Sequence, residues 1–236
     1  MTGLSKIPFL TISFSNRLLP SEVTLFRGAV LSKVPKEFIL FHNHDGSGFR
    51  LAYPLIQYKS ISGHAAITCV GEGTSEIGAF FSNADFDVCI GERRERLEVQ
   101  NVWAKQWLLQ TWSDEFTYSI RRWLPLNKKN YELFKGLDGV VERTELLERI
   151  LVGNILSMSN GLGRYMDSRV TCKIVDISNT RMYRFKEVSL MGYDIEFKSN
   201  VYFPDMIGLG KGTSVGFGVV KQRRKKQAKD YSDGSE

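Results

Sequence analysis

Apolar and polar positions in the first ninety residues predict a strand, a helix, two strands, a helix and a strand, in that order. Residues 8–15 are rich in β-branched and aromatic side chains, which predicts a strand. Beyond Pro20, apolar side chains recur at helical spacing until Pro35 stops the pattern. The remaining expected elements are strands over 49–58, 64–70 and 86–90, a turn at Ser62 and Gly63, and a helix over 74–81. This β-α-β-β-α-β order is that of a ferredoxin-like unit.

A second cycle of the same kind fills the C-terminal half of the chain. Residues 116–126 have the pattern of a strand, and Asn127 and Gly136 are placed to begin and end a short helix. Thr144 is placed to cap a longer helix, whose apolar stripe predicts that one side of it lies in the core. Further strands are expected over 169–177, 182–188, 193–202 and 217–220. We therefore expect an α+β fold of two tandem ferredoxin-like (RRM-like) domains, residues 1–112 and 113–220, with a C-terminal glycine-rich loop.

The net charge is +6, from 32 Lys and Arg against 26 Asp and Glu, and it is unevenly distributed. Residues 221–236 hold six basic and three acidic side chains, so this stretch alone carries +3, half of the total. Clustered Lys and Arg bind polyanions by releasing condensed counterions. We expect residues 221–236 to be a basic disordered tail that either binds nucleic acid or keeps the protein soluble.

Composition excludes several classes of protein. With 42% hydrophobic and 25% charged residues, the chain is not disordered throughout. Cys69, Cys89 and Cys172 are odd in number and widely spaced, which excludes a disulfide framework and a Cys-x-x-Cys zinc site and favours a reducing compartment. No run approaches the roughly 18 apolar residues of a membrane span, and the N-terminus lacks a signal-peptide pattern. We expect a soluble, cytoplasmic protein with no membrane partner and no cofactor.

Residues 208–218 hold five glycines in eleven positions. Glycine permits positive φ and close approach of a phosphate to the backbone, so this stretch is a candidate main-chain cradle. It is not a nucleotide-binding P-loop, because Gly212 follows Lys211 where Ser or Thr is required. It is not a dinucleotide fingerprint either, because too little chain remains for the long helix that should follow. A glycine-rich hairpin or bulge is the alternative.

The spacing of these glycines resembles the C-terminal signature of CRISPR-associated RAMP-superfamily endoribonucleases, which cut precursor CRISPR RNA within its repeats. The signature is Gly-hydrophobic-Gly, five residues, then Gly-hydrophobic-Gly. Four other stretches resemble the b-type branch of that family: 41–44 (Phe-His-Asn-His), 53–59 (Tyr-Pro-Leu-Ile-Gln-Tyr-Lys), 123–127 and 153–157. The resemblance covers about residues 5–220 and implies two ferredoxin-like domains side by side, with the glycine loop near bound RNA. Gly212 inside the spacer and the tail after Val220 depart from the pattern.

Histidines in the N-terminal region offer the chemistry that RNA cleavage needs. The 2′-hydroxyl of RNA can attack the adjacent phosphate when a base takes its proton and an acid protonates the departing 5′-oxygen. An imidazole titrates near neutral pH and suits either role. The resemblance implies a catalytic histidine in this region. We hypothesise that His42 or His44 is the general acid or base, with Tyr58 or Lys59 as helpers and Lys211 near the phosphates.

Other interpretations of the three histidines stay open. The stretch His-x-His-Asp at 42–45 could bind a divalent metal, but no second cluster of ligands is evident, so no metal site is predicted. Either His42 or His44 could instead hydrogen-bond a loop. His64 is expected to be structural or on the surface.

Arg121, Arg122 and Trp123 are consecutive in a predicted strand, so their side chains alternate between faces. One arginine could meet a phosphate while Trp123 packs inside, or Trp123 could stack on a base. The other tryptophans, at positions 103, 107 and 112, are expected in the core. The predicted RNA-binding residues are Gly208, Gly210, Lys211, Gly212, Ser214, Gly216, Gly218, Arg121 and Arg122.

The sequence therefore predicts a metal-independent endoribonuclease that cuts CRISPR repeat RNA by 2′-hydroxyl attack on the adjacent phosphate. The expected ends are a 5′-hydroxyl and a 2′,3′-cyclic phosphate or related 3′ end. The alternative is a non-catalytic RNA-binding RAMP subunit of a CRISPR effector complex. The expected partner is CRISPR repeat RNA, and both a monomer and a homodimer fit the sequence.

Overall fold

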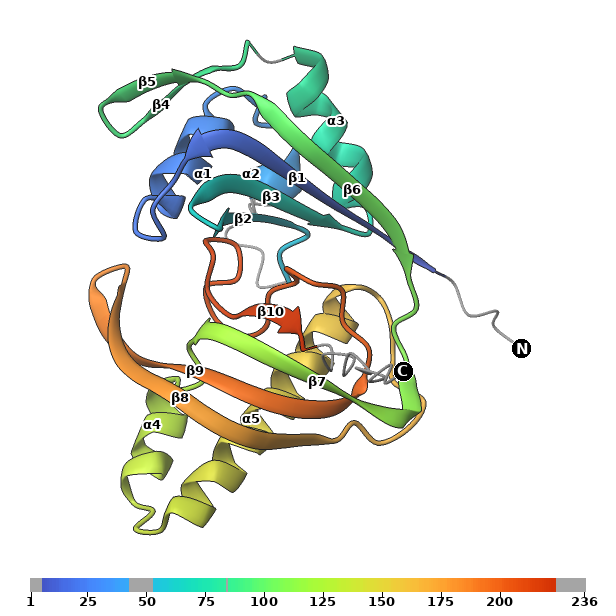
Figure 1. Ribbon diagram of the computed structural model, residues 1–236, viewed down its shortest axis with the longest axis vertical. Helices are drawn as coiled ribbons and strands as arrows, with labels where there is room; N and C mark the ends of the chain where they lie inside the picture. The colour runs from blue at the N-terminus through green and yellow to red at the C-terminus, as the bar shows by residue number, and fades with distance from the viewer. Residues whose placement is uncertain (1–5, 43–52, 84, 224–236) are drawn as a thin grey trace, which may run out of the picture.

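The computed structural model describes residues 6–42, 53–83 and 85–223. They form an α+β structure with two four-stranded antiparallel sheets, one in each half of the chain. The sheet of the N-terminal unit lies above that of the C-terminal unit, and the glycine-rich segment runs between them (Figure 1). No helix in the described part of the chain has the length and apolar character needed to cross a membrane.

The N-terminal unit has the strand order of a ferredoxin-like sheet. Its sheet runs β2-β3-β1-β6, so the first strand lies inside, between β3 and β6. Helices α1 and α3 cover one face, where Phe26 and Phe80 are fully buried in its hydrophobic core. The elements are β1 (Ile7–Arg17), α1 (Val23–Leu31), α2 (Ile39–His42), β2 (Ile56–Ile61), β3 (His64–Val70), α3 (Gly73–Asn83) and β6 (Val99–Trp107).

The fourth strand of this sheet is β6, and the prediction that residues 86–90 fill that place is wrong. Those residues contribute β4 (Asp87–Ile90), which turns at Gly91 (φ +63°) and pairs only with β5 (Arg93–Arg96) in a small separate sheet. The strand β6 was missed because it is an edge strand, and its residues 99–106 are exposed on both faces. Alternation of polar and apolar residues is absent from such a strand.

The exposure of β6 also corrects the prediction for the tryptophans. Trp107 is buried, with 1% of its surface exposed, and its Nε1 donates to the Tyr202 carbonyl oxygen (2.8 Å). Trp103 is 56% exposed on β6, and Trp112, which is 38% exposed, lies near the start of the next strand. A core position was therefore correct for one of the three.

The C-terminal unit repeats the strand order but lacks the second helix. Its sheet runs β10-β7-β9-β8, the ferredoxin-like order again. Where a ferredoxin-like unit would place its second helix, between β9 and β10, residues 202–218 form a loop that includes the glycine-rich stretch. The elements are β7 (Thr111–Trp123), α4 (Lys128–Lys135), α5 (Val140–Gly161), β8 (Cys172–Phe185), β9 (Val188–Val201) and β10 (Val219–Gln222).

Residues 182–188 do not form a strand of their own. The chain continues in β8 to Phe185, turns at Lys186 (φ +56°) and returns as β9, so the two make one long hairpin. Register shifts between Ile174 and Asp176 and between Ile177 and Asn179 interrupt the alternation, which is why the sequence pattern divides β8.

The helices of this unit begin close to the predicted places. Asn127 caps α4 as predicted, because its side-chain oxygen accepts from the Asn130 N–H (2.8 Å). The long helix α5 begins at Val140, four residues before Thr144, whose hydroxyl donates to the Val140 carbonyl instead of capping. The predicted apolar stripe is confirmed, since Ile150 is half-buried and the other four of its five residues are buried: Leu147, Leu151, Ile155 and Met158.

The C-terminal strand reaches into the stretch expected to be a tail. Lys221 and Gln222 belong to β10 and pair with Ser119 and Tyr118 of β7. The expected tail therefore begins inside the sheet, and the part of it from residue 224 onwards lies outside the described residues.

The two units share one apolar interface. Phe9 and Val70, on the face of the N-terminal sheet away from its helices, pack in the same cluster as Ile207 and Leu209 of the loop. This shared core holds the loop between the sheets.

Candidate functional site

The glycine-rich loop docks on the free edge of the N-terminal sheet. The Tyr58 N–H donates to the Ser214 carbonyl (3.0 Å), and Tyr58 pairs with Val215 in a parallel bridge. At its base, Gly208 pairs with Val219 in an antiparallel bridge. The loop thus extends the N-terminal sheet by a short stretch beside its edge strand β2, contributed by the other unit (Figure 1).

The protein's own packing requires glycine at several positions of the loop, as Gly210 and Gly218 illustrate. Gly210 has φ +84°, and a Cβ there would lie 2.9 Å from both the Trp123 Nε1 and the Asn154 Oδ1. Gly218 has φ +62°, and a Cβ there would lie 1.9 Å from the Leu209 carbonyl oxygen. The alternative interpretation of the stretch, a structural glycine loop, therefore accounts for these two positions.

Part of the loop backbone already has partners inside the protein. The Leu209 N–H donates to the Gly218 carbonyl (2.8 Å), and the Gly218 N–H donates to the Arg122 carbonyl (3.2 Å). Gly208, Gly216 and Gly218 are buried, whereas Gly210, Gly212 and Ser214 are half-buried and Lys211 is exposed. A ligand would therefore reach the loop at its apex, residues 210–214.

Trp123 packs inside, which decides between its two predicted placements. It is fully buried, and its Nε1 donates to the Asn154 Oδ1 (2.9 Å). Asn154 comes from α5, so one hydrogen bond joins two of the stretches on which the family resemblance rests. Both side chains support Gly210 from beneath.

Arg122 holds the loop and the two units together. Its backbone has φ +53°, and its N–H donates to the Asp194 carboxylate (2.7 Å). Its guanidinium donates to the Pro20 carbonyl of the N-terminal unit (3.1 Å) and lies 4.2 Å from the centre of the Phe217 ring. Through these contacts Arg122 stabilises the interface between the two units. Arg121, by contrast, has a 56% exposed side chain, with Asp194 as its ion-pair partner (3.2 Å).

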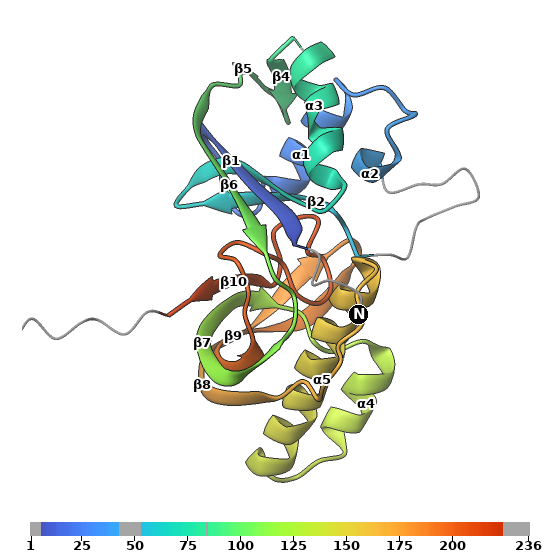
Figure 2. The same cartoon turned by 90° about the vertical axis from the view of Figure 1, so that its right-hand side faces the viewer.

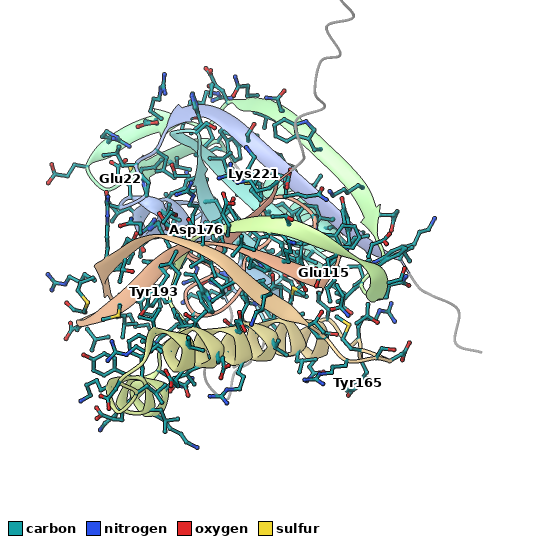
Figure 3. The ribbon with its side chains drawn as sticks, turned by 60° about the horizontal axis from the view of Figure 1, so that its bottom comes forward. Glu22, Glu115, Tyr165, Asp176, Tyr193 and Lys221 are labelled. Atoms are coloured by element: carbon teal, nitrogen blue, oxygen red, sulfur yellow. The ribbon has the colours of Figure 1, made fainter. Side chains whose placement is uncertain are left out.

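A cleft of about 560 Å³ opens between the two units beside these arginines. Its basic side chains are Arg121, Arg122, Lys221 and Arg223, and the turn after β2 forms the opposite wall. Arg223 pairs with Glu196, so two carboxylates offset part of the positive charge of the cleft. Lys221 lies between the strands of the two units in Figure 3.

His42 lies on the other side of the molecule from β10. It ends α2, which is at the right of Figure 2, whereas β10 is at the left. Its Nε2 lies 3.3 Å from the carbonyl oxygens of Val34 and Pro35, and the side chain is half-buried. His44 and Asp45 lie outside the described residues. The Nδ1 of His64 lies 2.9 Å from the Ser15 carbonyl oxygen at the start of β3, which fits a structural role.

Tyr58 and Lys59 lie on opposite faces of the N-terminal sheet, and both are buried. The Tyr58 ring packs against Phe26 (5.9 Å between centres), and burial raises the pKa of its phenol well above the usual range. Its hydroxyl is without a hydrogen-bond partner among the described residues. Lys59 is fully buried on the face towards the loop, where burial lowers the pKa of its ammonium to about 7.

Gln57 and Tyr53 contact the loop directly, and neither was predicted as a site residue from the sequence. The Gln57 Oε1 accepts from the Gly208 N–H (3.0 Å) and from the Lys59 Nζ (2.8 Å). The Gln57 Nε2 donates to the Tyr53 hydroxyl (2.8 Å), which donates to the Gly208 carbonyl (2.8 Å). The available signal was the spacing of Gln57 and Lys59, two polar residues on one face of a mostly buried strand.

The described residues contain no group of three or more His, Cys, Asp and Glu side chains that could hold a metal ion.

Two family models match this chain, one after the other. The model of the Cas6b N-terminal domain matches residues 5–107, and that of the Cas6b C-terminal domain matches residues 110–223. An uncharacterized protein of Methanocaldococcus jannaschii is 38% identical over 101 residues, which are 43% of this chain and 67% of that protein.

Solved structures resemble the whole fold. A crystal structure of Cas6b is 29% identical with a TM-score of 0.85, covering 93% of this chain and 100% of that one. A second, described as the CRISPR RNA processing endoribonuclease Cas6b, is 28% identical with a TM-score of 0.72 over the same shares. The type IV Cas6 crRNA endonuclease Csf5, 15% identical with a TM-score of 0.53 over 93% of this chain and 100% of that one, shares the fold.

Proposed function

Because this chain belongs to the Cas6b family, we propose that it is an endoribonuclease that cuts CRISPR repeat RNA without a metal ion. One observation carries the proposal: both Cas6b domain models match in chain order, over residues 5–107 and 110–223. A relative with 28% identity that covers 93% of this chain is described as a CRISPR RNA processing endoribonuclease.

The proposed reaction is an attack by the 2′-hydroxyl oxygen on the adjacent phosphorus. A base takes the hydroxyl proton while the O2′–P bond forms, and an acid gives a proton to the 5′-oxygen while the P–O5′ bond breaks. The products are a 2′,3′-cyclic phosphate and a 5′-hydroxyl, so water is not a reactant in this step, and acid–base catalysis by side chains can carry it without a metal ion.

His42 and His44 are the proposed candidates for the base and the acid. The two carbonyl oxygens beside the Nε2 of His42 favour the tautomer that carries hydrogen on this nitrogen. That tautomer leaves a lone pair on Nδ1, which can take a proton from a 2′-hydroxyl.

Exposed cations at two places are the proposed RNA contacts. Lys211 lies at the loop apex, with its Nζ 5.5 Å from the centre of the Phe185 ring. Arg121 and Lys221 line the cleft between the units. Because α2 and β10 lie on opposite sides in Figure 2, the cleft would hold RNA that is remote from the His42 side.

The test incubates the purified protein with repeat RNA in EDTA, beside an RNA with a 2′-deoxy nucleotide at the cleavage site. We expect cutting of the intact RNA and none of the deoxy RNA. Loss of cutting in EDTA, or equal cutting of both RNAs, contradicts the mechanism. Tight repeat-RNA binding without single-turnover cleavage favours the non-catalytic subunit of an effector complex.

The variants His42→Ala and His44→Ala assign the roles. Cleavage lost with binding retained identifies the acid or base. Unchanged cleavage rates in both variants exclude His42 and His44 as the acid and the base.

A further inference from the structure

The face of β2 towards the C-terminal unit buries two polar side chains, Gln57 and Lys59. Both are 0% exposed. Lys59 takes part in none of the ion pairs among the described residues, and its hydrogen-bond partner there is the neutral Gln57 carboxamide. Burying an ammonium without a carboxylate destabilises a fold, so packing alone does not explain Lys59.

We propose that Lys59 is a positioning residue that locks the Gln57 carboxamide in the one orientation able to clamp Gly208, and so fixes the glycine-rich loop for RNA. This inference rests on the proposed function. We call the four residues Tyr53, Gln57, Lys59 and Gly208 the clamp.

The orientation follows from the donors. An ammonium can only donate, so the atom that faces the Lys59 Nζ must be the Gln57 Oε1. The Gly208 N–H needs the same oxygen. The Gln57 Nε2 is then left to donate to the Tyr53 hydroxyl and to the Pro54 carbonyl (3.0 Å).

Tyr53 completes the clamp on the other side of Gly208. Its hydroxyl accepts from Gln57, so its own hydrogen is free to reach the Gly208 carbonyl. Both polar groups of one loop residue are thus held by side chains of the N-terminal unit. A Cβ on Gly208 would lie 2.9 Å from the Gln57 Oε1, so the contact leaves no room for a side chain.

The clamp joins the two parts of the molecule to which the reaction is assigned. Tyr53 is the first described residue after His44 in the chain, and it also packs closely on α5, where a Cβ on Gly161 would meet the Tyr53 Cβ at 2.4 Å. Gly208 is the base of the loop whose apex carries Lys211. Loss of these hydrogen bonds would let the loop move relative to the unit that carries the histidines. A small displacement of RNA-binding groups from the catalytic groups slows the reaction more than it weakens RNA binding.

The protonation state of Lys59 affects the orientation of the Gln57 carboxamide. Its pKa of about 7 means that ammonium and amine are both populated near neutral pH. A neutral amine can accept a hydrogen bond, so it would tolerate a flipped carboxamide that removes the acceptor from Gly208. The titratable side chains around Lys59 are Cys69 on β3 and, through Gln57, Tyr53; burial raises the pKa of both, so both stay neutral.

The test compares Lys59→Met, Gln57→Leu and the double variant, with Thr68→Val as the matched control. Thr68 is also fully buried and lies opposite Gln57 on β3. Single-turnover cleavage of repeat RNA, the dissociation constant for that RNA, and hydrogen exchange of residues 206–214 are measured for each.

We expect Lys59→Met to cleave about tenfold more slowly or worse, with RNA affinity within about threefold of wild type and faster exchange in the loop. The double variant should be no slower than Gln57→Leu, because Lys59 acts through Gln57. Thr68→Val should leave rate and loop exchange unchanged.

Wild-type cleavage and wild-type loop exchange in Lys59→Met would overturn the clamp. Additive losses in the double variant would overturn the route through Gln57. If the wild-type protein cuts no repeat RNA, the proposed function fails, while loop exchange in Lys59→Met still decides whether the clamp exists.

Discussion

Replacing the buried Lys59 by methionine should make the protein more stable near neutral pH and flatten its stability profile. Lys59 is 0% exposed, and burial lowers its pKa from 10.5 to about 7. The unfolded chain holds this proton up to about pH 10.5, whereas the folded protein releases it through about pH 7. Because the unfolded state binds more protons between these values, the free energy of unfolding rises with pH there.

The magnitude follows from the two pKa values. Each pKa unit corresponds to 1.36 kcal/mol. The lowered pKa of Lys59 therefore reduces the free energy of unfolding by about 5 kcal/mol well below pH 7 and by about 4 kcal/mol at pH 7. Between about pH 6 and about pH 8.5 this cost falls by about 2 kcal/mol. Methionine also loses the hydrogen bond to Gln57, worth about 2 kcal/mol. The net gain at pH 7 is therefore about 2 kcal/mol.

Urea unfolding at three pH values, about 6, 7 and 8.5, measures this effect. The matched control is Lys105→Met, which removes the same charge from an exposed position on β6. The range stops at about pH 8.5 because Cys69, whose pKa burial raises, begins to lower stability as unfolded thiols ionise. Parallel profiles for wild type and Lys59→Met, or a Lys59→Met protein less stable at pH 7, would refute the reasoning; Lys105→Met should keep the wild-type slope.

Two further predictions concern the glycines and the tail. Gly210→Ala should lower the free energy of unfolding by about 1–3 kcal/mol, because φ is +84° and the new Cβ meets Trp123 and Asn154. Gly153→Ala, in α5 with open space around it, should raise the free energy of unfolding by up to about 1 kcal/mol. Urea unfolding of both variants measures the two effects. Deleting residues 224–236 should weaken repeat-RNA affinity and reduce its salt dependence without changing specificity, and an unchanged low-salt affinity would make this stretch a solubility feature. The deletion begins after β10, which keeps Lys221 and Gln222 in the sheet.

The sequence predicts the fold where strands alternate or helices carry one apolar stripe. The cap at Asn127 and the stripe of α5 follow from local rules, and the structure has both. Prediction fails at β6, whose exposed edge carries no periodicity, and at Trp103, whose apolar side chain suggested burial. Both errors have one cause: the position of a strand in a sheet is set by pairing with distant residues, which a local pattern does not contain.

The candidate site shows the same limit in another form. Glycine spacing located the loop, and Lys59 was singled out by its place in a motif. Gln57 was not, because its importance lies in an oxygen shared with Gly208, a residue far away in the chain. Arg122, which was predicted to meet RNA, lines the cleft, and its guanidinium also contacts Pro20 and Phe217, which the sequence did not predict. The positive φ of Arg122 helps to set which of the two adjacent arginine side chains is more exposed, and the sequence does not reveal that backbone angle.

Replacement of a helix by the loop of residues 202–218 explains why the mainly apolar joint between the two units also buries polar groups. A helix would satisfy its own backbone and offer only side chains to the opposing sheet. The loop instead brings bare peptide groups against β2, and each buried group there needs a partner. Tyr58 supplies one through its backbone N–H, and Gln57 and Tyr53 supply two through side chains. The buried Lys59 then follows as the group that keeps Gln57 correctly oriented, at an energetic cost that the pH profile of unfolding measures directly.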